Sequence, residues 1–187
     1  MYGYGREQIA LTRDVEALQV PSGSKVTLKA GSVVTLTQAL GGNFTVIAAD
    51  GNMARIDGEN ADALGKEKVV APQLHPKDVS RETVEKAVWE QLKTCYDPEI
   101  PVDIVELGLV YQCDVTPSVL DDKIFSVYIQ MTLTAPGCGM GDVIAAEART
   151  KVERIPGVRE VEVELTFEPP WSREMMSEAA RLQLGML

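Results

Sequence analysis

Residues 125–167 read FSVYIQMTLTAPGCGMGDVIAAEARTKVERIPGVREVEVELTF, and this stretch decides the fold. Apolar residues occupy every second position in 125–133 and again in 161–167, which predicts two strands that each bury one face. Between them, apolar residues recur at four-residue spacing, which is typical of a helix, and Pro156 and Gly157 end it. The stretch therefore predicts a strand, a helix over about residues 139–155 and a second strand.

Elements on either side extend this arrangement. Residues 107–115 alternate with the same parity, so a third strand is expected to share the buried face. Ser80 is a candidate cap for a helix that runs to about Cys95, and Ser172 for a final helix. The inner stripe expected for this last helix consists of Met175, Ala179 and Leu182. Helices on one face of a short sheet predict a two-layer α/β domain over residues 77–187.

The first part of the chain has a different pattern. Segments 25–29, 32–40 and 43–48 alternate between polar and apolar residues, and turn-forming Gly, Asn and Asp separate them, so we expect short strands. This indicates a small all-β unit over residues 1–70, joined to the second domain near residues 66–77. The expected fold class of the whole chain is α+β.

Charge and hydropathy exclude several classes of function. The net charge is −10; the first 76 residues carry 7 Lys and Arg against 8 Asp and Glu, and the remainder carries 11 against 20. Such an acidic surface repels phosphate backbones, so we expect no nucleic-acid partner. No apolar run is long enough to span a membrane, and the first residues lack the pattern of a secretory signal. We therefore expect a cytoplasmic protein that does not bind membranes.

Cys138 is the candidate functional thiol. It lies between the strand predicted in 125–133 and the helix that follows, with Gly137 and Gly139 as neighbours. A helix N-terminus stabilises an anion, and a thiolate is the form of cysteine that binds metal or attacks sulfur. The glycines would leave the sulfur unshielded. A tight turn in which Cys138 only packs is the alternative, and the pattern leaves both open.

Other sites are less well supported. Cys95 and Cys113 fall on apolar faces and are expected to be inert core thiols, and the cysteines form no C-x-x-C pair. A phosphate-binding loop would need Lys followed by Ser or Thr, where this chain has Asp142. Acidic residues in 97–106 could supply oxygen ligands or a proton acceptor, or could form a solvated turn.

Three motifs in order carry a resemblance to a known family. They are DPEIPVDIVELGLVY at 97–111, TLTAPGCGMG at 132–141 and PPWSREMMSEAARLQLGM at 169–186. Together they resemble the PaaD-like, metal-sulfur cluster biosynthetic family of iron-sulfur cluster assembly proteins. The extension ALTRDVEALQVPSGSKVTLKAG at 10–31 is similar to that of the SufT branch. The chain departs from the commoner pattern at Gly139, where proline often occurs, and at Asp103, where asparagine is usual.

The resemblance implies an iron-sulfur protein maturation factor that acts as a carrier, adaptor or targeting protein, and not an enzyme. Its reactive cysteine corresponds to Cys138, with Thr134 four residues before it, and its acidic pair corresponds to Asp97 and Glu99. The implied partners are the assembly machinery and client apoproteins.

The number of thiols limits how such a protein could hold a cluster. Clusters are usually held by four cysteine thiolates, so a single Cys138 would have to share a transient cluster with a second chain or a client. We therefore expect a homo-oligomer with a metal ligand at Cys138 from each chain.

Two alternatives remain open in the sequence. The protein could instead be a thiol-based redox enzyme or sensor in which Cys138 is oxidised reversibly. Trp171, in the PPWS segment, could be a core residue that pins the final helix. It could also form an apolar wall that keeps water and oxygen away from the thiolate or its cluster.

Overall fold

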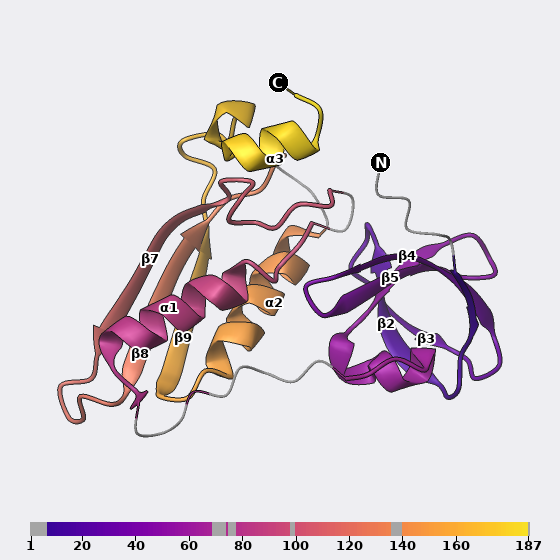
Figure 1. The fold of residues 1–187 in the computed structure, drawn as a ribbon, viewed down its shortest axis with the longest axis horizontal. Helices are drawn as coiled ribbons and strands as arrows, with labels where there is room; N and C mark the ends of the chain where they lie inside the picture. The colour runs from indigo at the N-terminus through magenta and orange to yellow at the C-terminus, as the bar shows by residue number, and fades with distance from the viewer. Residues whose placement is uncertain (1–6, 69–73, 75–77, 98–99, 136–139, 187) are drawn as a thin grey trace. The chain divides into compact units, whose positions relative to one another are not determined.

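The computed structural model describes residues 7–68, 74, 78–97, 100–135 and 140–186 of the chain (Figure 1). The chain divides into two compact units, residues 1–70 and residues 71–187. Unit 1 contains a six-stranded sheet, and unit 2 contains a three-stranded sheet with helices. This architecture confirms the α+β class.

Unit 1 is a curved antiparallel sheet (Figure 1). Its strand order is β1-β4-β5-β6-β2-β3. The strands are β1 (Glu7–Ala10), β2 (Val15–Val20), β3 (Lys25–Leu28), β4 (Val33–Leu40), β5 (Asn43–Ile47) and β6 (Met53–Ile56). A 3-10 helix, η1 (Gly58–Leu64), follows and adds Ala61 and Leu64 to the core. The three segments predicted from alternation are the strands β3, β4 and β5, but β5 is buried at four consecutive positions and not on one face only.

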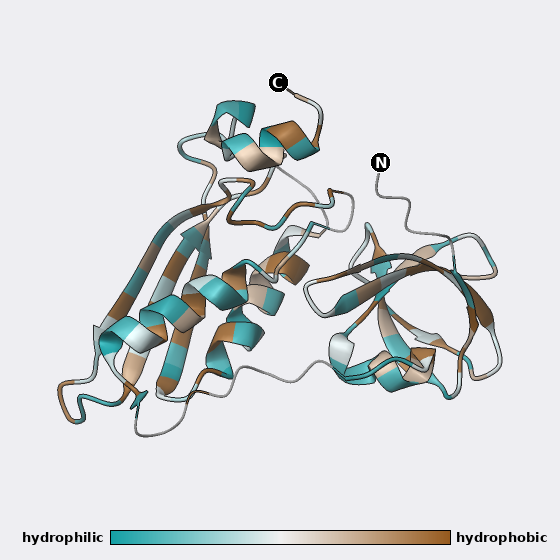
Figure 2. Ribbon diagram, viewed as in Figure 1, coloured by the Kyte–Doolittle hydropathy of each residue, from teal (hydrophilic) through white to brown (hydrophobic). Residues whose placement is uncertain are grey.

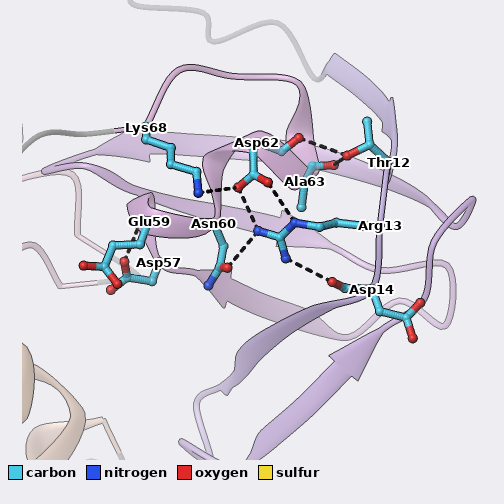
Figure 3. A network of polar contacts seen from close by, with 9 residues as sticks. All are labelled: Thr12, Arg13, Asp14, Asp57, Glu59, Asn60, Asp62, Ala63 and Lys68. Carbon is cyan, nitrogen blue, oxygen red and sulfur yellow. Dashed lines mark hydrogen bonds and ion pairs between the residues drawn. The ribbon is translucent and has the colours of Figure 1, made fainter.

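Side-chain hydrogen bonds link η1 to the turn between β1 and β2 (Figure 3). The Arg13 guanidinium donates to both carboxylate oxygens of Asp62, at 2.7 and 2.8 Å, and to Asn60 Oδ1 at 2.9 Å. Hydrogen bonding from Arg13 holds the pKa of Asp62 well below its usual range. These side chains are partly exposed, so they orient the turn more than they stabilise the unit.

The sheet of unit 2 has the order β7-β8-β9. Its strands are β7 (Val110–Pro117), β8 (Phe125–Met131) and β9 (Val158–Leu165). β7 pairs antiparallel with β8, and β8 pairs parallel with β9. A parallel pair needs a crossover, which α2 (Gly141–Glu153) supplies. The predicted strand, helix and strand are therefore a βαβ unit.

Two helices cover one face of this sheet. α1 (Arg81–Leu92) begins at a capping box, in which the side-chain oxygen of Ser80 accepts from Thr83 N and that of Thr83 accepts from Ser80 N. The cap predicted at Ser80 is therefore confirmed. α1 and α2 lie on the same side of the strands (Figure 1). The core between the layers includes Val84, Val88, Val115, Val127, Ile129, Ile144, Val152 and Val161. The ribbon accordingly alternates between brown, for apolar residues, and teal, for polar residues, along these strands (Figure 2).

The predicted buried face is only partly buried along the two edge strands, and in β9 Val163 and Leu165 are half-buried. Tyr111 and Cys113 are only half-buried, because β7 is an edge strand and its register shifts between Val110 and Gln112. Phe167 is 41% exposed, because β9 ends at Leu165 and the chain leaves the sheet there.

The single final helix predicted from Ser172 is also wrong. A 3-10 turn, η3 (Arg173–Met175), is followed by extended backbone at Met176 and then by α3 (Glu178–Gln183). Ser177 caps α3 by accepting from Ala180 N at 3.0 Å, whereas Ser172 makes no side-chain cap bond. The break changes which side chains point inward.

The inner residues of this region differ accordingly from the predicted stripe of Met175, Ala179 and Leu182. Met176 and Ala180 are buried, and Leu182 is 66% exposed.

Candidate functional site

Three segments meet at the end of the unit 2 sheet where β8 finishes and α2 begins. They are residues 132–135 after β8, residues 97–109 before β7 (the acidic loop) and residues 166–186 after β9 (the C-terminal strap). Thr132 N donates to Leu109 O at 2.8 Å, and Thr166 N donates to Met131 O at 2.9 Å. The fold therefore brings together segments that are far apart in the sequence.

The predicted thiol Cys138, with Gly137 and Gly139, lies outside the described residues. The two sides of its segment pack tightly against each other. Leu133 and Met140 are buried, and a Cβ on Gly141 would lie 2.3 Å from Leu133 Cδ1. The end of β8 and the start of α2 are thus held close together.

The start of α2 has no side-chain cap. Met140 occupies the cap position and makes no side-chain hydrogen bond there. The first N–H groups of a helix have no partner within the helix and carry partial positive charge. Thr134 on the strand side is half-buried and Ala135 is exposed. The described flanks of the segment therefore suit a thiolate, although Asp142 in the first turn adds a negative charge.

Carboxylates of the acidic loop shape its turns. Asp97 is 8% exposed, and its Oδ1 accepts from Ile100 N at 3.2 Å. Asp103 Oδ1 accepts from Val105 N and Glu106 N, each at 3.0 Å, and burial raises the pKa of Asp103. Glu99 lies outside the described residues. At least part of this acidity therefore stabilises the backbone and does not form a simple solvated turn.

The C-terminal strap binds the acidic loop through side chains. Trp171 Nε1 donates to Leu107 O at 2.8 Å. Ser177 N donates to Glu106 O at 2.9 Å, and Ser177 Oγ donates to the Glu106 carboxylate. Trp171 is half-buried, so it is neither a fully buried core residue nor a free surface residue.

Gly108 is a site residue that the sequence did not single out. Its φ is +70°, and a Cβ there would lie 2.2 Å from Met175 O. Only glycine lets the loop and the strap approach so closely. Its place between Leu107 and Leu109, just before a strand, is the signal that could have identified it.

The remaining cysteines differ in exposure. Cys95 is completely buried, as predicted. Cys113 is half-buried, and burial, followed by the charges of Glu85 and Asp114, raises its pKa to about 12. Cys113 is therefore held in the protonated form near neutral pH, and Cys95 is out of reach of solvent.

Within the described ranges, no three or more His, Cys, Asp and Glu side chains gather as a metal site. None of the helices in the described part of the chain has the length and hydropathy needed to cross a bilayer.

Comparison with known proteins points to one family. The model of a family described as "Iron-sulfur cluster assembly protein" matches residues 85–165, within unit 2. A "Fe-S protein maturation auxiliary factor" of Porphyromonas gingivalis is 47% identical over 103 residues, which are 55% of this chain and 92% of that protein. The "Fe-S protein maturation auxiliary factor SufT" of Staphylococcus aureus is 41% identical over 90 residues, which are 48% of this chain and 96% of that protein.

One more distant relative is much longer than the segment that it shares with this chain. An "Iron-sulfur cluster carrier protein" of Deinococcus radiodurans is 31% identical over 78 residues, which are 42% of this chain but 20% of that protein. By contrast, the matched segments make up nearly all of the two maturation factors, so those proteins have no room for a second unit of the size of unit 1.

Proposed function

Because this chain belongs to the iron-sulfur cluster assembly protein family, we propose that it matures iron-sulfur proteins and that Cys138 is its working thiol. The cluster, or its iron, is cargo that passes through the protein. The partners are the assembly machinery and client apoproteins, and the protein works in the cytoplasm without catalysing a reaction of its own.

The state of the other thiols is the observation that carries this proposal. The chain has three cysteines. Cys95 is completely buried, and the pKa of Cys113 is raised to about 12, so neither is a good metal ligand or nucleophile near neutral pH. The thiolate chemistry of this chain therefore falls to Cys138, beside the uncapped start of α2.

A single thiolate per chain requires a shared cluster. Since four cysteine ligands are usual, the others come from a second chain, a client or a small thiol. Such a cluster is labile, which suits transfer, and pairing of two chains through it makes the protein a homo-oligomer when loaded. The supporting residues that we propose are Thr134, Gly137, Gly139, Asp97, Glu99 and Trp171.

The redox alternative receives less support. A thiol enzyme or sensor that forms an internal disulfide needs an accessible resolving cysteine. Cys95 is not accessible, and Cys113 resists ionisation.

Anaerobic reconstitution with iron and sulfide tests the proposal. The wild type and the matched control Cys113→Ala are expected to gain visible absorbance and bound iron, and Cys138→Ala is not. The loaded protein is expected to elute as an oligomer and to return to its original size when its cluster passes to an apo-ferredoxin. Equal iron content in Cys138→Ala and the wild type would show that Cys138 is not the ligand.

A further inference from the structure

The face of the unit 2 sheet that points away from α1 and α2 carries a regular array of polar side chains. The register aligns Asp114 of β7, Tyr128 of β8 and Glu162 of β9 in one row across the sheet. The rows on either side contain Gln112, Gln130 and Glu164, and Thr116, Ser126 and Glu160. Tyr128 and Gln130 are half-buried and the other seven residues are exposed, so within unit 2 this outer face is open to a partner.

The outer face has one sign of charge. Asp114, Glu160, Glu162 and Glu164 supply four carboxylates, and none of the nine positions is Lys or Arg. Glutamates at every second position of β9 lie on one side of the strand and repel one another, so an opposing positive surface would relieve the repulsion. The face is therefore complementary to a protein surface rich in Lys and Arg.

The turn between β7 and β8 adds an apolar contact point next to this face. Val119 is 101% exposed and Leu120 is 93% exposed. The turn is ordered by hydrogen bonds from Ser118 N to Ile124 O, at 2.7 Å, and from Ile124 N to Asp121 O, at 3.1 Å. Two adjacent apolar side chains on a defined turn suit an apolar pocket in a partner, because interfaces surround apolar anchors with a polar rim.

The charges beside the turn favour a protein over a membrane as the occupant. Asp121 and Asp122 directly follow Leu120 and would be repelled by anionic lipid headgroups. Lys123 and Arg159 are basic residues at this end of the sheet, and neither belongs to the rows of the outer face.

We propose that the outer face of the β7-β8-β9 sheet, together with the Val119–Leu120 turn, docks a protein whose Lys and Arg residues surround an apolar patch. This inference goes beyond the proposed function, because the surface excludes Cys138 and can recruit a partner whether or not the thiol carries cargo.

Cytochrome c is a suitable probe, since its lysines surround an apolar haem edge. Titration of the isotope-labelled full chain is expected to shift amides of β7, β8, β9 and the 118–123 turn, with saturation at low ionic strength. Binding should weaken strongly at about 0.15 M salt. The Cys138→Ala variant is expected to bind like the wild type, which separates this test from that of the proposed function.

Charge-matched variants make the test specific. The triple variant Glu160→Gln, Glu162→Gln, Glu164→Gln should raise the Kd about tenfold or more. The control triple Glu82→Gln, Glu90→Gln, Glu178→Gln removes the same charge from exposed helix positions and should raise it less than about threefold. The double variant Val119→Ser, Leu120→Ser should raise the Kd without changing its salt dependence. Equal weakening by both triples, no effect of the double variant, or no saturable binding would overturn the proposal.

Discussion

The indole N–H of Trp171 donates a 2.8 Å hydrogen bond to the backbone carbonyl of Leu107, 64 residues earlier in the chain. This bond joins the C-terminal strap to the acidic loop at the end of the sheet where α2 begins. The structure therefore explains one role of Trp171, which is to attach the C-terminal strap to the acidic loop. A role as a wall beside Cys138 stays a prediction.

Trp171→Phe keeps an aromatic ring and removes the donor, so it should lower the free energy of unfolding by about 1 kcal/mol. Trp171→Ala also removes the half-buried ring and should cost about 2–3 kcal/mol, below the usual range for a fully buried tryptophan. Urea unfolding followed by circular dichroism measures both. If Trp171→Phe is as stable as the wild type, the bond to Leu107 contributes nothing.

The wall hypothesis is tested by the alkylation rate of Cys138 in Trp171→Ala under conditions where the variant is still folded. Loss of an apolar wall should raise this rate severalfold, because reagent and water gain access to the thiol. The Trp171→Phe variant is the control, and its rate should match the wild type. An unchanged rate in Trp171→Ala would leave Trp171 as a packing residue only.

Gly108→Ala should destabilise unit 2 by about 3 kcal/mol or more, since backbone strain at positive φ adds to a steric clash. The new Cβ would lie 2.2 Å from Met175 O, a backbone atom that cannot move away alone. Gly185→Ala is a matched control, with the same φ of +70° and no atom within 4 Å of the new Cβ. It should cost only about 1 kcal/mol. Equal unfolding midpoints for the two variants would show that the strap does not need its close approach at Gly108.

Limiting alkylation of the folded protein should label Cys138 first, Cys113 slowly and Cys95 last. The reason is that reactivity follows thiolate fraction and exposure. Peptide mass spectrometry identifies the labelled residues. Faster labelling of Cys95 or Cys113 would contradict both the structure around them and the assignment of Cys138.

The raised pKa of Cys113 also predicts a pH dependence. The pKa of the Cys113 thiol is near 9.0 in the unfolded chain, and burial raises this pKa to about 12 in the folded protein. Between these values the unfolded chain binds fewer protons, so stability should fall as pH rises above about 9. Cys113→Ala should lose less stability than the wild type over that range. Parallel stability curves would show that Cys113 ionises normally in the folded state.

Mild trypsin treatment should cut first between residues 66 and 77, where the sequence predicts the linker. Lys66, Lys68 and Lys77 are the cleavage sites in that stretch. Two fragments that each keep a cooperative unfolding transition would establish two independent domains. First cleavage within either sheet, or joint unfolding of the fragments, would argue for one folding unit.

Local sequence patterns are enough to predict several elements of unit 2. The alternation in 125–131, the four-residue spacing of Ile144, Ala148 and Val152, and the cap at Ser80 all depend on neighbours within a few positions, and the structure has each of them. The three motifs, which occur in the family's order along the chain, likewise indicate the family from the sequence alone. The assignment of Cys138 and Glu99 rests on the sequence alone, because both lie outside the described residues.

The contacts between the acidic loop and the C-terminal strap, at the end of the unit 2 sheet, depend on the tertiary structure. The final helix breaks at Met176 and restarts after Ser177, and both the backbone and the hydroxyl of Ser177 bond Glu106, 71 residues away. Gly108 is required by its contact with Met175, and the half-burial of Tyr111 follows from a register shift against β8. These contacts join segments that are distant along the chain. Periodicity indicates which face of an element is apolar and not which distant segment packs against it, so residue spacing does not show that Gly108 meets Met175 or that Ser177 bonds Glu106.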